Sequence, residues 1–563
     1  MKKSLLFAGL LAMGLSAMAQ NPYAYNATTG EVDVNTLTVP VNYALCADAE
    51  RVVVDFMLNG EVKKSVELDA EAITAGEHAV NVSLEGLDPA TYDLALRVKG
   101  AELTEPVQCD PVYTFWSPYG IAIDNDPMSP HFGRLLITEC QPSVNTAGAS
   151  YWTGINNEGV GAGIYVFDPQ MQRVANPEGK YGYVGDPNLQ ENYAYANYTG
   201  GTGNNFALKK VKISKDGRIF VGGLDVKNGQ PLYEVNPDNL AEWTPVFVGE
   251  KKEYEETGYD CNLYTEDGDF VAGYSACFAV TGEGENLKIM NHSCTRGQVF
   301  TYGAYKMYEY PLGTATTWAA AADEMDEVFP LSGQYTISAQ SVSIDYDPNG
   351  NLWWTQYRGT PNDAQPTLKH VSKNADGEWE EDYSIVTDTI IPIPFNRGGG
   401  IAVSPDGSKI ALSTGNFKLT VADVTYNEFG TPTIDFENAM SVMSTDVRGF
   451  NDIAWDYAGN LYACDNGKET FRRFAFPRTA AAAPAGMKRA QGDDPNEAIT
   501  PLRPDYAVEV PTVTAVRDIN TKAVASVEYV NVNGQVSNVP FEGVNVVVTK
   551  YADGTKSVTK IVK

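Results

Sequence analysis

Apolar and polar residues alternate with a period of two along most of this chain, and such alternation predicts short β-strands. In the N-terminal part the alternating segments are 51–58, 61–68, 78–84 and 92–98. Asn59-Gly60 separates the first two segments, and this dipeptide favours a tight hairpin turn. Residues 20–110 are therefore expected to form a small β-sandwich.

Residues 111–477 repeat one pattern, in which an apolar strand, a turn that contains glycine, a second strand and a third strand follow one another. The turns are 132–134, 215–218, 266–269, 347–351, 405–408 and 457–460. The first strands are expected at 120–124, 211–214, 261–264, 342–345, 400–404 and 451–456. One such unit cannot bury both faces of its sheet, whereas units arranged in a ring bury each sheet against the next. The pattern predicts a β-propeller of six blades, with seven as the alternative because the turns are unevenly spaced.

Alternation resumes in the C-terminal part, at 525–536, 541–550 and 553–563, and it predicts a small β domain over 511–563. Residues 478–510 separate this domain from the propeller. They are rich in alanine, proline and glycine and are expected to form a linker. The fold class predicted for the whole chain is thus all-β.

Residues 1–19 have the composition of a secretory signal peptide. Two lysines follow Met1, residues 5–15 are apolar, and Ala17-Met18-Ala19 has the form of a cleavage site. Cleavage is expected between Ala19 and Gln20. The apolar run is much shorter than the roughly 20 residues that span a bilayer, so we expect export through the Sec translocon and no transmembrane segment.

The net charge of −31 is spread along the chain, which argues against nucleic acid as a partner. The seven cysteines lie far apart and the four histidines lack metal-ligand spacing, so no cofactor is expected. Calcium is left open without a supporting motif, because the loop that begins at Asp345 has Gln356 where a calcium loop needs glutamate. Cys46 and Cys109 could pair in an oxidising compartment.

The repeated phrase of strand, Asp-Gly turn and Ile-Tyr-Val-like strand resembles the repeats of NHL-type and gluconolactonase-like propellers. Gluconolactonase-like propellers hold a metal with acidic and asparagine side chains at the mouth of the central channel, and that set cannot be matched here residue by residue. In the N-terminal domain, the phrases 75–78 and 86–92 resemble immunoglobulin-like modules of bacterial surface proteins, which space or present a neighbouring domain.

The C-terminal segment contains the phrases Tyr-x-Asn-x-x-Gly-Gln at 529–535, Gly-Val-x-Val-Val-Val at 543–548 and Asp-Gly-Thr at 553–555. These phrases resemble the sorting domains of type IX secretion cargo, with Asn545 where that family commonly has tyrosine. The resemblance implies the type IX secretion machinery as a partner and a secreted or cell-surface location.

In a propeller, the residues just before each inner strand gather at the mouth of the central channel. We predict a ligand-binding set at these positions: Tyr119, Asn205, Tyr259, Gln340, Arg397 and Arg448. Aromatic rings stack on planar ligand groups, and arginine and amide side chains supply directional hydrogen bonds.

Motifs for a serine nucleophile or a zinc peptidase are absent from the sequence, and no catalytic residue is predicted. The sequence favours a secreted or cell-surface protein without catalytic activity that binds a glycan, a peptide or a protein through the channel face. Two alternatives stay open: a metal-dependent hydrolase or lactonase on the propeller, and a structural component of the cell envelope.

Overall fold

The structure of the protein is a computed structural model. It describes residues 21–115, 118–139, 159–160, 163–184, 208–223, 230–251, 263–273, 275, 277–294, 305–319, 326–327, 343–355, 366–386, 400–414, 418–443, 450–465, 470–477, 494, 496–512 and 524–563. These residues form β-strands, turns and short 3-10 helices, with no α-helix among them, as the all-β prediction required. No helix in these ranges has the length and apolar character needed to cross a bilayer. The 3-10 helices are η1 (Ala70–Ala72), η3 (Gly284–Asn286) and η5 (Pro504–Tyr506).

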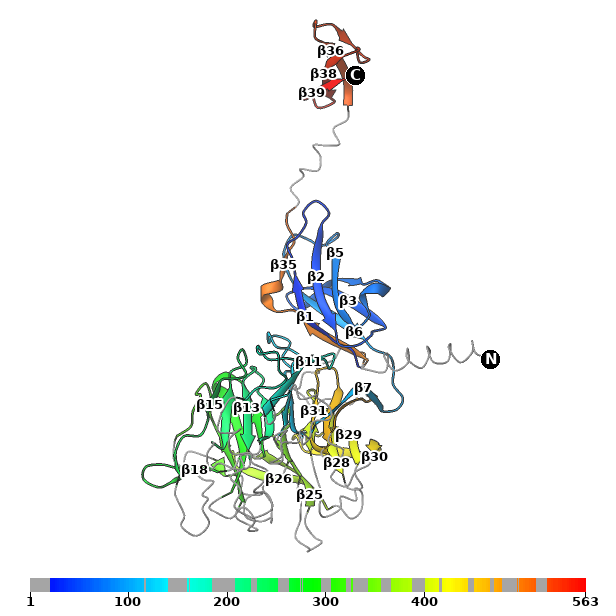
Figure 1. Cartoon of the computed structure of the whole chain (residues 1–563). Helices are drawn as coiled ribbons and strands as arrows, with labels where there is room; N and C mark the ends of the chain where they lie inside the picture. The colour runs from blue at the N-terminus through cyan, green and yellow to red at the C-terminus, as the bar shows by residue number, and fades with distance from the viewer. Residues whose placement is uncertain are drawn as a thin grey trace, which may run out of the picture. The chain divides into compact units, whose positions relative to one another are not determined.

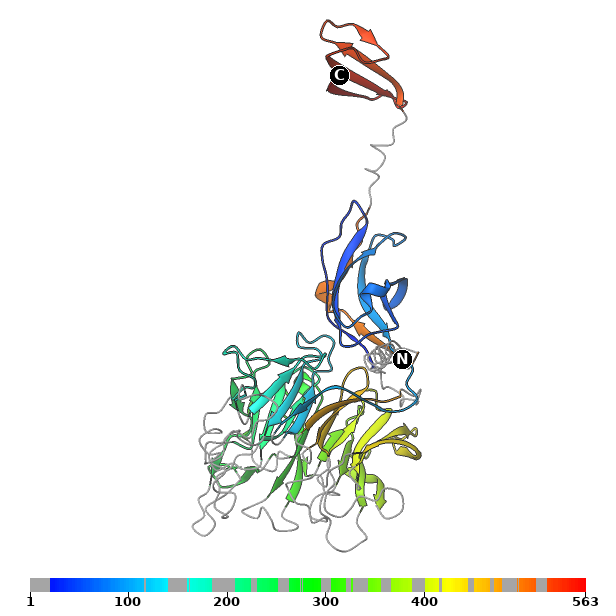
Figure 2. The same cartoon turned by 45° about the vertical axis from the view of Figure 1, so that its right-hand side comes forward.

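Two antiparallel sheets form the N-terminal sandwich (Figures 1 and 2). One sheet consists of β1 (Ala24–Thr29), β2 (Thr38–Leu45) and β5 (Gly76–Ser83). The other consists of β4 (Glu61–Glu67), β3 (Arg51–Leu58), β6 (Thr91–Lys99) and β34 (Glu497–Pro501), and β35 (Val508–Glu509) follows β34 in the chain. Alternate residues of β3, namely Val52, Val54 and Phe56, are fully buried. Asn59 and Gly60 both have positive φ, so the predicted hairpin turn is present.

The sandwich receives one strand from beyond the propeller. β34 pairs with β6 over its whole length, from Glu497 opposite Lys99 to Pro501 opposite Ala95. The Glu497 carboxylate accepts a hydrogen bond from Arg51 on β3 and lies 3.7 Å from Arg97 on β6. The predicted linker, 478–510, therefore does not extend through residues 497–501, because this segment buries Ala498 and anchors its acidic side chain between two arginines.

Between residues 107 and 477 the described chain forms six four-stranded antiparallel sheets (Figure 1). The first three sheets are β8 (Pro118–Ile123), β9 (Leu135–Glu139), β10 (Gly163–Phe167) and β11 (Arg173–Val174); β12 (Leu208–Ile213), β13 (Ile219–Gly223), β14 (Leu232–Val235) and β15 (Trp243–Pro245); and β19 (Phe278–Thr281), β20 (Lys288–Cys294), β21 (Tyr305–Tyr310) and β22 (Asp326–Glu327). The next three are β23 (Ser343–Tyr346), β24 (Leu352–Thr355), β25 (Pro366–Lys373) and β26 (Trp379–Val386); β27 (Ile401–Val403), β28 (Lys409–Thr414), β29 (Lys418–Tyr426) and β30 (Pro432–Met443); and β31 (Phe450–Trp455), β32 (Asn460–Asp465), β33 (Thr470–Ala475) and β7 (Val107–Thr114).

The first strands of these sheets contact one another in a closed circle. The order around the circle is β8, β12, β19, β23, β27, β31 and again β8. Sheets that share a central axis in this way form a β-propeller. The last sheet is completed by β7, which precedes the other propeller strands in sequence and pairs with β33, with Thr114 opposite Thr470 and Cys109 opposite Arg473.

The third repeat differs from the prediction. Residues 261–264 were expected as an inner strand, but β17 (Leu263–Tyr264) instead belongs to a three-stranded sheet with β16 (Glu250–Lys251) and β18 (Phe270–Ala272). The strand that contacts both β12 and β23 is β19. The reason lies in packing, because Leu263 and Val271 join an apolar cluster with Phe220 of β13 and Ile289 of β20 and so fill space between two neighbouring sheets.

The predicted glycine turns are present, and each has its glycine at positive φ. These glycines are Gly133, Gly217, Gly268, Gly350, Gly407 and Gly459. A polar side chain at the start of the turn accepts backbone N–H groups from its end. Asp347, for example, accepts hydrogen bonds from the N–H groups of Asn349 at 2.8 Å and Asn351 at 2.9 Å. In five of the six turns this acceptor is an aspartate, serine or threonine three residues before the glycine, so the sequence pattern encodes the turn geometry.

The C-terminal residues form a compact unit separate from that of the sandwich and the propeller. Its sheet has the order β37 (Val536–Ser537), β36 (Val524–Asn531), β38 (Val544–Tyr551) and β39 (Lys556–Val562). Asn545 is fully buried there, accepts a hydrogen bond from Phe541 N and donates to Phe541 O and Gly543 O. The asparagine thus holds the turn before β38 through contacts that a tyrosine side chain could not make.

A substitution at Gly120 on β8 can test how closely the inner strands pack. A Cβ atom there would lie 2.7 Å from Lys209 O and 2.8 Å from Lys210 Cα, both backbone atoms of β12. We expect Gly120→Ala to lower the free energy of unfolding by about 1–3 kcal/mol, because β8 and β12 must move apart. Denaturant unfolding measures this. Thr244→Ala, at an exposed position of β15, is the control and should change stability by less than about 0.5 kcal/mol; equal effects of the two substitutions would contradict the close packing.

Candidate functional site

An axial cavity of about 980 Å³ lies inside the circle of first strands. Every strand of the circle contributes to its lining, through Ile121, Lys212, Thr281, Asp345, Val403 and Ile453 among others. The lining continues along the turns that follow these strands, where it includes Asn125, Asn286, Asn349 and Ser404. Its volume falls within the range of about 300–1,000 Å³ typical of small-molecule sites.

Side chains of one sheet bind backbone N–H groups of the next sheet around the axis. Ser343 Oγ accepts a hydrogen bond from Ile401 N at 3.1 Å, and Asp345 Oδ2 accepts one from Val403 N at 2.9 Å. Asp452 Oδ2 accepts one from Ile121 N at 3.0 Å. An inner strand has a strand partner on one side only, so these acceptors satisfy donors that would otherwise be buried without partners.

Asp452 also forms the closest ion pair at the axis. Its Oδ1 atom lies 2.6 Å from Lys210 Nζ, and both side chains are buried. Asp452 stands on β31 and Lys210 on β12, with β8 between them in the circle. At Gly120 the backbone of β8 lies in close contact with that of β12. Because these two strands are so close, the Asp452 carboxylate of β31 can bind both and link three neighbouring inner strands. A buried pair of this kind is costly to break on one side only.

Lys212 and Asp345 face the cavity without an ion pair between them among the described residues. Burial by itself would lower the pKa of the Lys212 ammonium group, but the carboxylates of Asp452 and Asp345 outweigh it and raise that pKa. Burial also raises the pKa of the Asp345 carboxyl, against the opposing effect of Lys212. Lys212 lies two residues from Lys210 on the same strand, so both point to the same side of β12.

A second polar group surrounds Glu309 of β21 at the edge of the cavity. Lys373 Nζ lies 2.8 Å and Lys288 Nζ 3.2 Å from the Glu309 carboxylate, and Tyr346 donates its hydroxyl hydrogen to it at 3.3 Å. Burial and the negative charge of Glu309 raise the pKa of Tyr346. The Glu309 carboxylate thus binds two ammonium groups and one hydroxyl group, and these contacts link β20, β21, β23 and β25.

The two buried histidines of the propeller have opposite electrostatic environments. His370 lies 2.6 Å from Asp382 Oδ1 and 3.2 Å from Asp347 Oδ2. Burial lowers the pKa of His370, but the two carboxylates raise it by more than burial lowers it. The pKa of His370 therefore lies above its ordinary value. For His292 of β20, burial lowers the pKa to about 3.

Of the predicted ligand-binding set, Tyr119 is the member that falls within the described ranges. It lies on β8, where Lys209 Nζ is 3.5 Å from the centroid of its ring, and it is not part of the axial cavity lining. The other predicted residues lie outside the described ranges: Asn205, Tyr259, Gln340, Arg397 and Arg448. The cavity lining comes instead from within the inner strands and from the turns after them.

Lys212 and Asp345 were missed by sequence reasoning, although a signal was present. Each is a charged residue inside a short strand that is otherwise buried, as Lys-Val-Lys-Ile at 210–213 and Ser-Ile-Asp-Tyr at 343–346 show. Both faces of an inner strand in a propeller pack against neighbouring sheets, so a charged side chain within it indicates a position where that face opens toward the axis. The spacing of such charges could have identified the lining.

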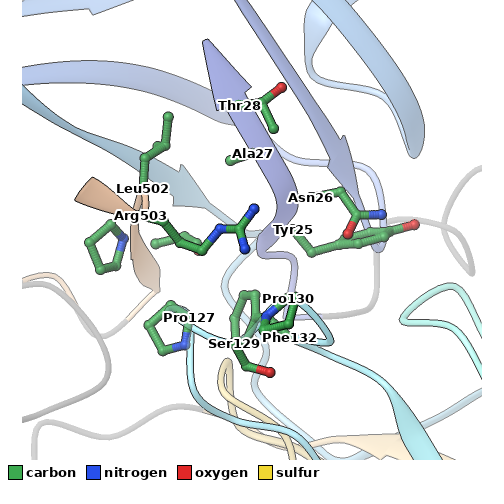
Figure 3. A pocket seen from close by; sticks show the side chains of 12 residues that line it. Tyr25, Asn26, Ala27, Thr28, Pro127, Ser129, Pro130, Phe132, Leu502 and Arg503 are labelled. Carbon is green, nitrogen blue, oxygen red and sulfur yellow. The ribbon is translucent and has the colours of Figure 1, made fainter. Parts of the chain in front are cut away.

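A smaller cavity of about 140 Å³ lies where the sandwich meets the segment 127–132 of the propeller. Figure 3 shows Arg503 and Phe132 on opposite sides of this hollow, with Tyr25 beside them. Arg503 donates a hydrogen bond to the Tyr506 hydroxyl at 2.7 Å and is thereby held in place. At this volume the hollow is smaller than typical ligand sites, and the axial cavity is the stronger candidate.

Within the described part of the chain, no group of three or more histidine, cysteine, aspartate or glutamate side chains is arranged to hold a metal ion. Cys46 and Cys109 are both buried and are not joined in a disulfide, so the pairing considered for them is not formed. Cys46 lies in an apolar cluster with Tyr23 and Phe132, whereas Cys109 lies on β7 opposite Arg473. The thiols therefore serve packing in two different places.

A scan of protein-family models finds no match, and a search of curated proteins finds no match of significance. Among solved structures, a structural genomics protein of unknown function from Bacteroides thetaiotaomicron VPI-5482 is similar to this chain at 12% identity and a TM-score of 0.36, covering 80% of this chain and 98% of that one. The β-propeller domain of Myceliophteria thermophila Cps50 (Swd1) matches at 10% identity and a TM-score of 0.30, covering 81% and 100%. Both TM-scores lie below 0.5, so the propeller assignment stands on the sheet topology described above.

The environment of His292 generates a pH prediction. The unfolded chain binds a proton at this residue near pH 6.5, whereas the folded chain does so only near pH 3, so stability is lost as the pH falls through this window. From pH 8 to pH 5 the wild type should lose about 2 kcal/mol of unfolding free energy relative to His292→Gln, which cannot take up the proton. Urea unfolding at the two pH values measures the difference, and parallel pH profiles would contradict the prediction.

Proposed function

We propose that this chain is an exported protein without catalytic activity that binds a glycan, a peptide or a partner protein at the axial cavity of its propeller. The observation that carries the proposal is the cavity itself, of about 980 Å³, with polar side chains from several inner strands directed into it. Sites of this kind combine a large apolar lining with a few placed polar groups. Here Ile121, Val403 and Ile453 supply the apolar part, and Lys212 and Asp345 the polar part.

We further propose that the propeller has six blades. The closed circle of first strands supports this number, since β12 and β19 are direct neighbours in it. The sheet of β16, β17 and β18 would then be an insertion between the second and third blades rather than a blade of its own. Its apolar residues share one cluster with both neighbouring sheets, as an insertion of this kind would require.

Export is proposed from the two ends of the sequence, with the Sec translocon reading residues 1–19 and the type IX secretion machinery reading the C-terminal sheet. Most of the valines of this sheet that face solvent belong to β36, β37, β39 and their connections: Val524, Val532, Val536, Val539, Val558 and Val562. Exposed apolar side chains on a thin sheet are typical of a surface that another protein covers. The N-terminal sandwich would act as an immunoglobulin-like spacer that presents the propeller.

Thr281→Trp tests the cavity as the binding site. Thr281 lines the cavity at the end of β19, and an indole there should occupy part of its volume. Wild-type protein applied to glycan and peptide arrays should yield binders whose affinity falls at least tenfold in this variant, as measured by surface plasmon resonance. Thr244→Trp, the same exchange on the outer strand β15, should retain the affinity. Equal affinities of the two variants would place the ligand elsewhere.

Removal of residues 524–563 tests the proposed route of export. In a host with a type IX secretion system, the truncated chain should accumulate in the periplasm, and its amount on the cell surface and in the medium should fall at least tenfold in quantitative immunoblots. The full chain is the reference, and a full chain that carries Thr244→Trp controls for a mutated cargo. Undiminished delivery of the truncated chain to the exterior would refute recognition of this segment.

A further inference from the structure

Two charged side chains in the axial cavity have hydrogen-bonding capacity that the protein does not use. The described residues place no hydrogen-bond or ion-pair partner at the Lys212 ammonium group, which lines the cavity from β12. Asp345 lines it from β23, accepts a hydrogen bond from Val403 N through Oδ2, and also has the backbone N–H of Tyr346 beside its carboxylate. The ammonium group offers three donors, and the two carboxylate oxygens together have about four acceptor sites, more than these two N–H groups fill.

Lys212 and Asp345 approach the cavity from different sides. In the circle of first strands, β19 stands between β12 and β23, so the two side chains are not on adjacent strands. A ligand in the cavity can therefore accept from Lys212 and donate to Asp345 at the same time. Polar groups that are removed from bulk water gain most when a partner satisfies them, which favours a ligand with both kinds of group.

The charges around the axis restrict the charge of the ligand. On the inner strands Lys210 and Lys212 contribute two positive charges and Asp345 and Asp452 two negative charges, so this inner set is balanced; towards the edge of the cavity the lining adds Lys215, Lys288 and Lys373 against Glu309 and Asp347. An anionic or cationic ligand would add an uncompensated charge to a partly desolvated cavity, which is costly. A neutral ligand keeps the balance.

Among neutral ligands, the shape of the cavity distinguishes sugars from peptides. The closed circle of strands leaves an extended polypeptide to enter by its end, and a peptide end carries a charge. A sugar ring is neutral and compact, and each hydroxyl group both donates and accepts a hydrogen bond. The turns around the cavity add short amide and hydroxyl side chains, from Asn125, Asn286 and Ser404, that suit ring hydroxyls.

We propose that Lys212 and Asp345 form the polar centre of a subsite for a neutral sugar ring, with Lys212 donating to one hydroxyl group and Asp345 accepting from another. This inference rests on the proposed function, since it names the chemical class of the ligand that the axial cavity takes. Lys210 and Asp452 hold each other and hold β8, so they position the inner strands and are not counted among the ligand contacts.

Saturation-transfer NMR with defined probes tests the subsite on the full mature chain. The probes are glucose, galactose, mannose and N-acetylglucosamine as neutral sugars, triglycine as a zwitterionic peptide, and inorganic phosphate followed by its own resonance as an anion. Lys212→Met and Asp345→Asn are the variants, and both keep the size of the side chain. Asparagine can still accept the hydrogen bond from Val403 N through its amide oxygen, which preserves the fold at this point.

The controls repeat the same exchanges at exposed positions, as Lys63→Met on β4 and Asp376→Asn in the turn between β25 and β26. At least one neutral sugar should bind to the wild type, and its affinity should fall at least tenfold in each cavity variant and stay within twofold in the controls. Near-ultraviolet circular dichroism verifies that the variants are folded.

Three results would overturn the inference. Phosphate binding in the absence of sugar binding would show that the subsite takes an anion, and triglycine binding in the absence of sugar binding would show that it takes a peptide whose opposite charges pair with Lys212 and Asp345. Sugar binding that both cavity variants retain would place the sugar outside it. Absence of binding by every probe, together with array ligands that Thr281→Trp abolishes, would leave the axial cavity as the binding site and reject the sugar class.

Discussion

The structure depends on how the inner edges of the propeller sheets satisfy their backbone donors. Each first strand pairs with a second strand on one side and faces the axis on the other, where no strand is available. Side-chain oxygens of the preceding sheet take that place at Ile121, Ile401 and Val403. Without these acceptors, buried N–H groups would lack partners, and each would destabilise the fold by about 1–3 kcal/mol.

This constraint explains why the axial cavity is polar in a propeller whose strands are otherwise apolar. Asp452 has to lie at the axis to reach Ile121 N, and Lys210 then compensates its charge. Asp345 has to lie there to reach Val403 N, and Lys212 shares the same space. Asp345 thus both joins two sheets and lines the cavity, so at this residue stability and ligand binding depend on the same side chain.

Local signals in the sequence were sufficient for most of the strands and turns. The glycine turns were recognisable because Asp347 and its counterparts form side-chain to backbone hydrogen bonds within five residues. Such local bonds require particular residue types at fixed positions, and the sequence shows that pattern. The third repeat was misread because its turn at Gly268 has the same local chemistry, although it belongs to the sheet of β17 and β18. Turn chemistry identifies a hairpin but does not say where in the ring that hairpin stands.

Long-range features left weaker signals. β34 is five residues long and gains its place from Arg51 and Arg97, which lie about four hundred positions earlier in the chain. The residues next to Glu497 in the sequence give no signal that Arg51 and Arg97 are its partners. Likewise, Lys212 and Asp345 could be identified as charges in apolar strands, but their convergence depends on the order of the strands around the axis.

The position of β34 late in the sequence has a consequence for the order in which the chain folds. During synthesis from the N-terminus, β6 has an open edge until residues 497–501 are made, after all the propeller strands. The sandwich can therefore reach its final form only once the propeller sequence is complete. A chain truncated within the propeller would keep an unpaired strand edge exposed, and such an edge favours aggregation.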